Sequence, residues 1–160
     1  MENSIYEIVT FFEKQQHTQL QRQQFWQAQT KQLLKNFRVF REKSSDSVVI
    51  PPPMPILCLS LYRGQSRLDI PWILENPERC TSISRYIETM VNCYQNSLQV
   101  RGNDELIRWR ILYGRYIQPL SLSRTFICER EHISKSTLYR YEAQAIGTMS
   151  VLLFGAVAVF

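Results

Sequence analysis

Residues 121–149 have the sequence SLSRTFICEREHISKSTLYRYEAQAIGTM, and this stretch decides the predicted fold. It predicts two helices joined by a tight turn, because Ser123 and Ser134 each stand where a hydroxyl can accept a hydrogen bond from a free backbone N–H at a helix start. His132 falls at the turn, where the backbone often needs a positive φ that histidine tolerates better than bulky side chains do. The pattern is that of a helix-turn-helix, in which the second helix is presented to DNA.

Residues on the first predicted helix fit this motif with one exception. Cys128 supplies a small side chain where the two helices approach most closely, and Ile133 can fill the angle between them. Glu131 departs from the pattern, because an apolar residue is commoner at its position. The residues expected to face the core are Thr125, Phe126 and Ile127.

The second predicted helix divides into a buried stripe and an exposed face. Leu138, Tyr141, Ala145 and Met149 recur at spacings of three and four and form the stripe. The residues predicted to bind DNA are Lys135, Ser136, Thr137, Tyr139, Arg140 and Gln144, with Arg115 and Arg124 adding backbone contacts. The alternative is that they form a solvated face such as any surface helix has.

The side chains suggest different roles at DNA. Lys135 and Ser136 suit phosphates or base edges near the helix start. The planar fork of Arg140 matches O6 and N7 of guanine. Tyr139 can contact a thymine methyl group or a phosphate.

The first 43 residues predict a helical arm. Ser4 and Glu7 form a capping box that places a helix start near residue 5. A polar gap around His17 to Leu20 leaves open one long helix or two. The arm is expected to pack on a second subunit or across the C-terminal domain, or else to be an amphipathic helix that covers its own core. Its apolar positions are Ile5, Ile8, Val9, Phe12, Trp26, Leu33, Phe37 and Phe40.

Residues 44–55 predict a linker, because consecutive prolines lack backbone donors and favour extended conformations. Such a stretch can also attract a proline-binding partner, although a connector is the commoner role. The predicted organisation is therefore an arm at 1–43, a proline-rich linker at 44–55 and a helical DNA-binding domain at 56–160. Residues 56–73 predict irregular or short helical structure.

Two further helices are expected between residues 76 and 119. Asn76 and Pro77 are good cap and first-turn residues, and Asn103 or Asp104 can cap the second helix, which Pro119 closes. The first of these helices has a single apolar face, made of Cys80, Ile83, Ile87, Met90, Val91, Tyr94 and Leu98.

The chain ends in the apolar sequence TMSVLLFGAVAVF. A membrane-spanning helix needs about 20 apolar residues, so this shorter run with a glycine argues against a membrane anchor. The second helix of the motif is expected to continue through Gly147 or restart after it, and to pack on the N-terminal helices or on a second subunit. The apolar residues expected to be buried there are Val151, Leu152, Leu153, Phe154 and Val157.

Charge and composition favour a cytoplasmic binding protein over an enzyme. The net charge is +5, with basic ends and a middle that is not basic, which favours nucleic acid first and acidic membrane surfaces second. Two isolated histidines, no glycine-rich phosphate loop and no clustered carboxylates offer no set of catalytic roles and no cofactor site. No metal site is expected, because the cysteines form no close pair. The four cysteines, expected to be reduced and mostly buried, are Cys58, Cys80, Cys93 and Cys128.

A family resemblance rests on several short motifs. They are ILYGRYI at 111–117, I-S-x-S-T at 133–137, the Tyr-Arg that follows, Ala145-Ile146, and LLFG at 152–155. The last third of the chain thereby resembles the C-terminal region of ArpU/RinA-type phage transcriptional regulators, whose DNA-binding part is similar to region 4 of sigma-70 factors. The resemblance implies a phage or prophage activator of late genes.

The combined expectation is an all-α, cytoplasmic transcriptional regulator that binds double-stranded DNA as a homo-oligomer, most simply a dimer. Two alternatives remain open. One is a DNA-packaging subunit resembling a small terminase, with the N-terminal helix building a ring. The other is an adaptor that docks on RNA polymerase, as sigma region 4 does.

Overall fold

The structure is a computed structural model that describes residues 2–45 and 68–155, without the side chains of residues 2–9 and 11–17. It is all-α, as predicted, with six α-helices and no strand in these two segments. The helices are α1 (Glu2–Glu42), α3 (Ile70–Leu74), α4 (Pro77–Ser97), α5 (Asn103–Leu112), α6 (Arg124–Glu131) and α7 (Lys135–Phe154). Short turns, η1 (Leu98–Val100) and η2 (Tyr113–Ile117), follow α4 and α5.

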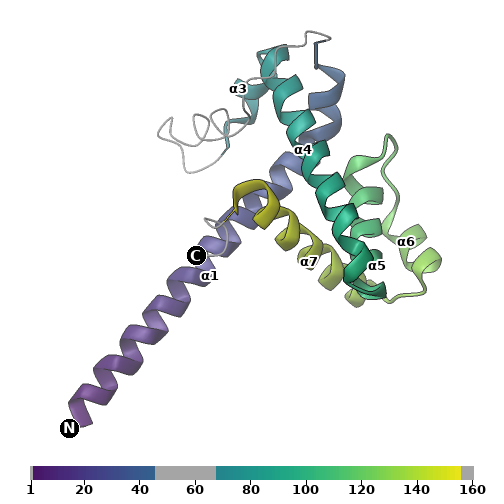
Figure 1. Ribbon diagram of the computed structural model, residues 1–160. Helices are drawn as coiled ribbons and strands as arrows, with labels where there is room; N and C mark the ends of the chain where they lie inside the picture. The colour runs from purple at the N-terminus through teal and green to yellow at the C-terminus, as the bar shows by residue number, and fades with distance from the viewer. Residues whose placement is uncertain (1, 46–67, 156–160) are drawn as a thin grey trace.

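Helix α1 is one continuous helix without a break near His17. Its N-terminal half projects away from the other helices, and its C-terminal half crosses them (Figure 1). Four side chains of that second half, Leu33, Leu34, Phe37 and Phe40, are fully buried. This part of α1 therefore belongs to the core of its own chain, which is one of the arrangements that the sequence left open.

Helices α3 and α4 follow the predicted local signals. The short helix α3 confirms short helical structure before residue 74, whereas residues 46–67, with most of the predicted linker, lie outside the described residues. Asn76 Oδ1 accepts hydrogen bonds from the backbone N–H groups of Glu78 and Arg79, at 2.8 and 3.2 Å. The predicted face of α4 is confirmed as buried at Cys80, Ile83, Ile87, Val91 and Tyr94 and as partly buried at Met90 and Leu98.

The start of α5 differs from the prediction by one residue. Gly102, with a φ of 80°, is the N-cap, so neither Asn103 nor Asp104 caps this helix. Because a positive φ costs glycine little, the chain can turn sharply here without a side-chain cap. Helix α5 then passes into the π-helical turn η2, and the chain leaves it before Pro119.

Helix α7 continues through Gly147 to Phe154, so the apolar tail is in part an extension of the same helix. Leu153 and Phe154 are buried and Leu152 is partly buried, as predicted, but Val151 is 43% exposed. It stands two residues from the buried Met149 and Leu153, which places it on the opposite side of the helix. Val157 lies outside the described residues. The Trp26 and Phe154 rings, 4.7 Å apart, join α1 to the end of α7, and the Tyr86 hydroxyl donates to the Leu153 carbonyl at 2.7 Å.

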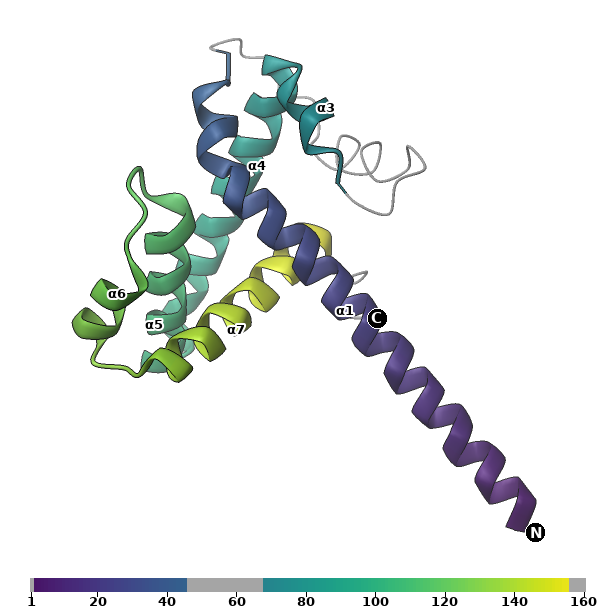
Figure 2. The same cartoon turned by 180° about the vertical axis from the view of Figure 1, so that it is seen from behind.

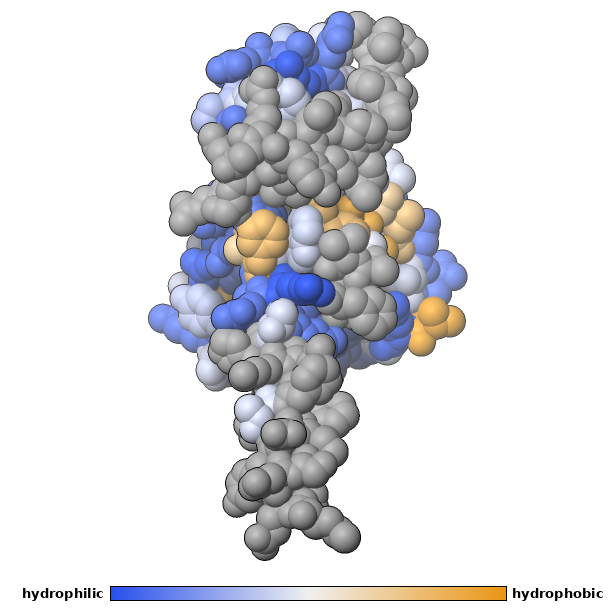
Figure 3. All heavy atoms as spheres, turned by 90° about the vertical axis from the view of Figure 1, so that its left-hand side faces the viewer, coloured by the Kyte–Doolittle hydropathy of each residue, from blue (hydrophilic) through white to orange (hydrophobic). Residues whose placement is uncertain are grey.

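Two apolar clusters form the interior. The larger one joins α1, α3, α4, the end of α5, η2 and the C-terminal half of α7. The smaller one joins α5, α6 and the N-terminal half of α7 through Ile111, Ile127, Leu138 and Tyr141. On the face seen in Figure 3, apolar side chains gather in the middle, between hydrophilic surfaces. None of the helices in the described segments is long and apolar enough to cross a membrane.

Candidate nucleic-acid interface

The turn between α6 and α7 is set by His132. Its φ and ψ of 54° and 46° lie in the left-handed region, which confirms the predicted positive φ. The backbone N–H groups of His132 and Ile133 both donate to the Cys128 carbonyl, which closes the end of α6. The sharp change of direction brings α7 across α6.

Both helices of the motif begin at the predicted serine caps. Ser123 Oγ accepts from the Phe126 N–H at 3.1 Å, and Ser134 Oγ accepts from the Thr137 N–H at 3.2 Å. The Ser134 hydroxyl also lies 2.9 Å from Thr137 Oγ1 and 3.0 Å from Ser136 Oγ. The hydroxyl groups at the start of α7 are therefore ordered by one another before any ligand binds.

The core-facing side of α6 is narrower than predicted. Ile127 is fully buried, but Thr125 is exposed and Phe126 is 48% exposed, so the prediction is wrong for both. The reason is that α6 is only eight residues long and contacts α5 and α7 along one side. Only one of these three consecutive residues can therefore face inward. Phe126 instead lies beside Arg130, whose guanidinium carbon is 6.0 Å from the ring centroid.

Glu131, the residue that departs from the usual motif, has an electrostatic role. Its side chain is only 6% exposed and forms ion pairs with Arg130 at 2.7 Å and Arg110 at 3.4 Å. The second pair ties the end of α6 to α5. An ion pair here replaces the apolar contact that an aliphatic side chain would make.

Helix α7 presents the predicted division into two faces. Leu138, Tyr141, Ala145 and Met149 are buried, which confirms the stripe. Thr137 is half-buried beside the cap. The predicted DNA-binding residues that are exposed together on the other side are Lys135, Ser136, Tyr139, Arg140 and Gln144.

The two additional arginines lie in a different setting. Arg115 is 19% exposed, donates to the Leu122 carbonyl at 3.0 Å and pairs with Glu142 at 3.5 Å. Arg124 is 37% exposed, pairs with Glu142 at 3.5 Å and places its guanidinium carbon 5.1 Å from the centre of the Tyr139 ring. Arg124 thus borders the exposed face, whereas Arg115 lies mostly beneath it.

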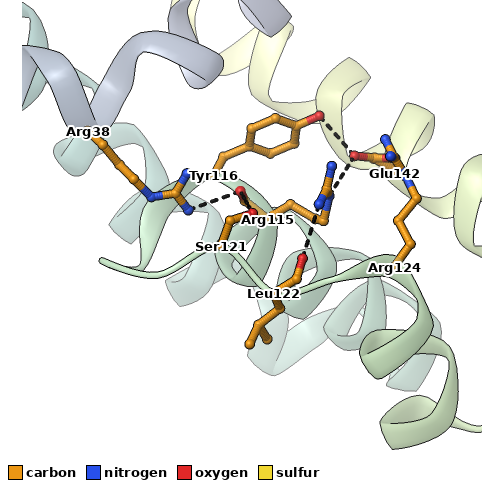
Figure 4. A network of polar contacts seen from close by, with 7 residues as sticks. All are labelled: Arg38, Arg115, Tyr116, Ser121, Leu122, Arg124 and Glu142. Carbon is orange, nitrogen blue, oxygen red and sulfur yellow. Dashed lines mark hydrogen bonds and ion pairs between the residues drawn. The ribbon is translucent and has the colours of Figure 1, made fainter.

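Glu142 is the centre of a polar network that sequence reasoning missed (Figure 4). Its side chain is 5% exposed and also accepts a hydrogen bond from the Tyr116 hydroxyl at 2.9 Å. Burial, and then the negative charge of Glu142, raise the pKa of the Tyr116 phenol. The available signal was an acidic residue next to the buried stripe of a helix, where a carboxylate needs partners.

The network also reaches α1. Arg38 donates through Nε to the Gln118 carbonyl at 2.8 Å and through Nη2 to the Arg115 carbonyl at 3.0 Å. The Ser121 hydroxyl donates to the same Arg115 carbonyl at 3.0 Å. These bonds fix the segment that leads into α6, so the position of the helix-turn-helix depends on α1.

Among the residues that the structure describes, no three His, Cys, Asp or Glu side chains gather where they could hold a metal ion. Cys80 is buried and Cys128 half-buried, as expected for packed thiols, but Cys93 is exposed on α4, and Cys58 lies outside the described residues.

Comparison with protein families, with curated proteins and with solved structures finds no match to this chain.

Proposed function

We propose that this chain is a sequence-specific transcriptional regulator that places the first turns of α7 in the major groove of double-stranded DNA. The observation that supports this is the exposed face of α7. Cationic and hydrogen-bonding side chains stand together there, beyond a left-handed turn and a serine cap. A major groove about 12 Å wide admits one α-helix with such a face.

The residues on this face divide into positioning and reading roles. Lys135 and Ser136, in the first turn, suit phosphates or nearby base edges. Arg140, one turn later, suits the two acceptors of a guanine, and Tyr139 a thymine methyl group or a phosphate. Gln144 stands one further turn along and can reach an adenine or a phosphate if the groove is followed that far. The Arg124 guanidinium lies against the Tyr139 ring and borders the same surface.

The resemblance to ArpU/RinA-type regulators extends the proposal to an activator of phage or prophage late genes. In this proposal a dimer binds the operator, and RNA polymerase is the partner of the bound regulator. The projecting half of α1 offers a surface to a second copy. Paired half-sites in the selected DNA are the expected sign of such a dimer, because operator symmetry reflects protein symmetry.

The direct test selects binding sites from a random-sequence duplex library and measures binding of variants to the selected site. Arg140→Ala should weaken binding to that site by about 1–3 kcal/mol and relax preference at one base pair. Lys135→Ala should weaken binding to the selected duplex and to random duplexes by the same factor. Lys43→Ala is the matched control, because Lys43 is exposed beyond the far end of α1.

Undiminished affinity of both variants, with intact helical structure, would contradict the assignment of α7 as the recognition helix. Mass measurement of the free protein addresses the alternative of a packaging subunit: a stable ring of many subunits would favour packaging over regulation. Co-purification with RNA polymerase without DNA, combined with no DNA binding alone, would favour the adaptor.

A further inference from the structure

A groove runs between α1 and α7, next to the exposed face of the recognition helix. One wall is formed by Gln27 and Lys31 of α1, and the other by Tyr139 and Ala143 of α7, with Arg124 at one end. Lys31 and Tyr139 therefore line the same groove although they are far apart in the sequence. The groove opens on the surface proposed above to meet DNA.

The groove exists because the two helices cross near one end of α7 and then diverge (Figure 2). At the crossing, a Cβ atom on Gly147 would stand 3.4 Å from Gln27 Nε2, so the side chain of Gln27 reaches α7 there. Towards the N-terminus of α7 the facing side chains are small, since Ala28 and Ala143 are exposed alanines. The small side chains therefore leave open space between α1 and α7 at the position of Lys31.

The electrostatics of the groove favour an anion. Lys31 is half-buried and makes no ion pair within residues 18–45 and 68–155, where side chains are described. The carboxylate beneath it, Glu142, is already paired with Arg115 and Arg124. The surroundings are therefore positive overall, and the Lys31 ammonium is available to a ligand.

We propose that Lys31 binds a backbone phosphate of the DNA strand that flanks the major groove occupied by α7. This inference rests on the proposed function and adds α1 to the DNA interface. A recognition helix lies between two phosphate backbones, so a cation at its side, beyond Tyr139, faces a backbone rather than base edges. The second half of α1 would then both anchor the helix-turn-helix and hold the DNA.

The test measures the salt dependence of binding for Lys31→Gln, which removes the charge and keeps a long side chain with good helix propensity. The slope of log affinity against log salt should fall by about 0.9, the value for one lost phosphate contact. Affinity should fall severalfold for selected and random duplexes alike. Lys31→Arg should retain the slope, and Lys43→Gln, a loss of the same charge at the other end of α1, should leave it unchanged.

A second measurement locates the contact on the DNA. In the selected duplex, single phosphates are replaced one at a time by neutral methylphosphonates. The wild-type protein should lose affinity at one position where the Lys31→Gln variant does not. This comparison does not depend on the absolute stability of the variant, because each protein is its own reference.

The outcomes separate the inference from the proposed function. A wild-type salt slope in Lys31→Gln, with Arg140→Ala still impaired on the selected site, would overturn the role of Lys31 and leave α7 as the recognition helix. A loss of affinity by Lys31→Gln that is confined to the selected duplex, with random duplexes bound as by the wild type, would also overturn it, because phosphates carry no sequence information. A wild-type protein that binds neither duplex would overturn both.

Discussion

Two buried tyrosine side chains each donate a hydrogen bond to a buried carboxylate. Tyr94 donates to Glu105 Oε1 at 2.6 Å, and Tyr116 donates to Glu142 Oε1 at 2.9 Å. Burial, followed by the neighbouring carboxylate, raises the pKa of each phenol, because a phenolate there would be desolvated and repelled. Both phenols stay protonated in the folded chain under conditions in which an unfolded tyrosine ionises.

This coupling predicts a loss of stability at alkaline pH. The stabilisation is fully present below the unfolded tyrosine pKa of about 10 and is lost as the pH rises above it, because the unfolded chain then binds fewer protons than the folded one. Urea unfolding from about pH 9 to about pH 11.5 should therefore give a falling free energy of unfolding. Tyr94→Phe should reduce the steepness of the fall, although it also leaves Glu105 without one donor.

Stability that stays constant across this range would contradict the coupling. So would a Tyr94→Phe variant that loses stability as steeply as the wild type. The two proteins are compared by the slope of their free energy of unfolding against pH. The cost of the lost hydrogen bond shifts the absolute stability and so does not enter this comparison.

At the scale of the helices, two glycines occupy opposite situations. Gly147 lies within α7, where an added Cβ would meet only the flexible end of Gln27 at 3.4 Å. Gly114 lies in the turn η2, where an added Cβ would stand 2.9 Å from Leu122 Cδ1. The Leu122 N–H also donates to the Gly114 carbonyl at 2.9 Å, which holds the two segments together.

The same substitution should therefore have opposite effects at the two sites. Gly147→Ala should stabilise the protein by about 0.5–1 kcal/mol, because alanine loses less backbone freedom in a helix. Gly114→Ala should destabilise it by about 1 kcal/mol, because Leu122 must move within a packed cluster. Thermal unfolding of the two variants side by side measures both, and equal shifts of the same sign would contradict the packing described at η2.

Local sequence signals predicted most helix ends because caps depend on neighbouring residues. Ser123, Ser134 and Asn76 act as the sequence indicated, and so does the left-handed turn at His132. Phe126 was misplaced because its burial depends on how α6 meets α5 and α7, which spacing along α6 alone does not determine.

The polar network around Glu142 could not be predicted from the sequence for a related reason. Arg38 and its acceptors are about 80 residues apart in the sequence, and no local pattern pairs them. The exposed face of α7 needed no such knowledge, since helical periodicity alone separates it from the buried stripe.

For the whole molecule, α1 has two parts with different roles. The side chains that it contributes to the described core begin at Trp26, whereas its N-terminal half projects beyond the other helices. Among the α1 side chains that are described, packing against the core is therefore confined to the second half of the helix. In the proposed regulator it is the part available to a second copy.

Removal of residues 1–17 tests this division. The shortened chain should keep its free energy of unfolding to within about 0.5 kcal/mol, because changes away from the core cost little. If the projecting half joins two copies, the mass in solution should fall from that of a dimer to that of a monomer, as measured by sedimentation. A large loss of stability would show that the first 17 residues support the core, and an unchanged dimer would place the interface elsewhere.

The uninterrupted course of α7 has a mechanical consequence. Its 20 residues form a rod whose C-terminal end is clamped by Trp26 of α1 and Tyr86 of α4, while its other end carries Lys135 and Arg140. At 1.5 Å per residue, a tilt of about 5° at the clamp moves a tip about 20 Å away by about 2 Å. Such a displacement is comparable to the length that separates a formed hydrogen bond from a broken one. Any force that rotates α1 would thus reach the far end of α7 as a movement that α5 and α6 share, because both pack on its N-terminal half.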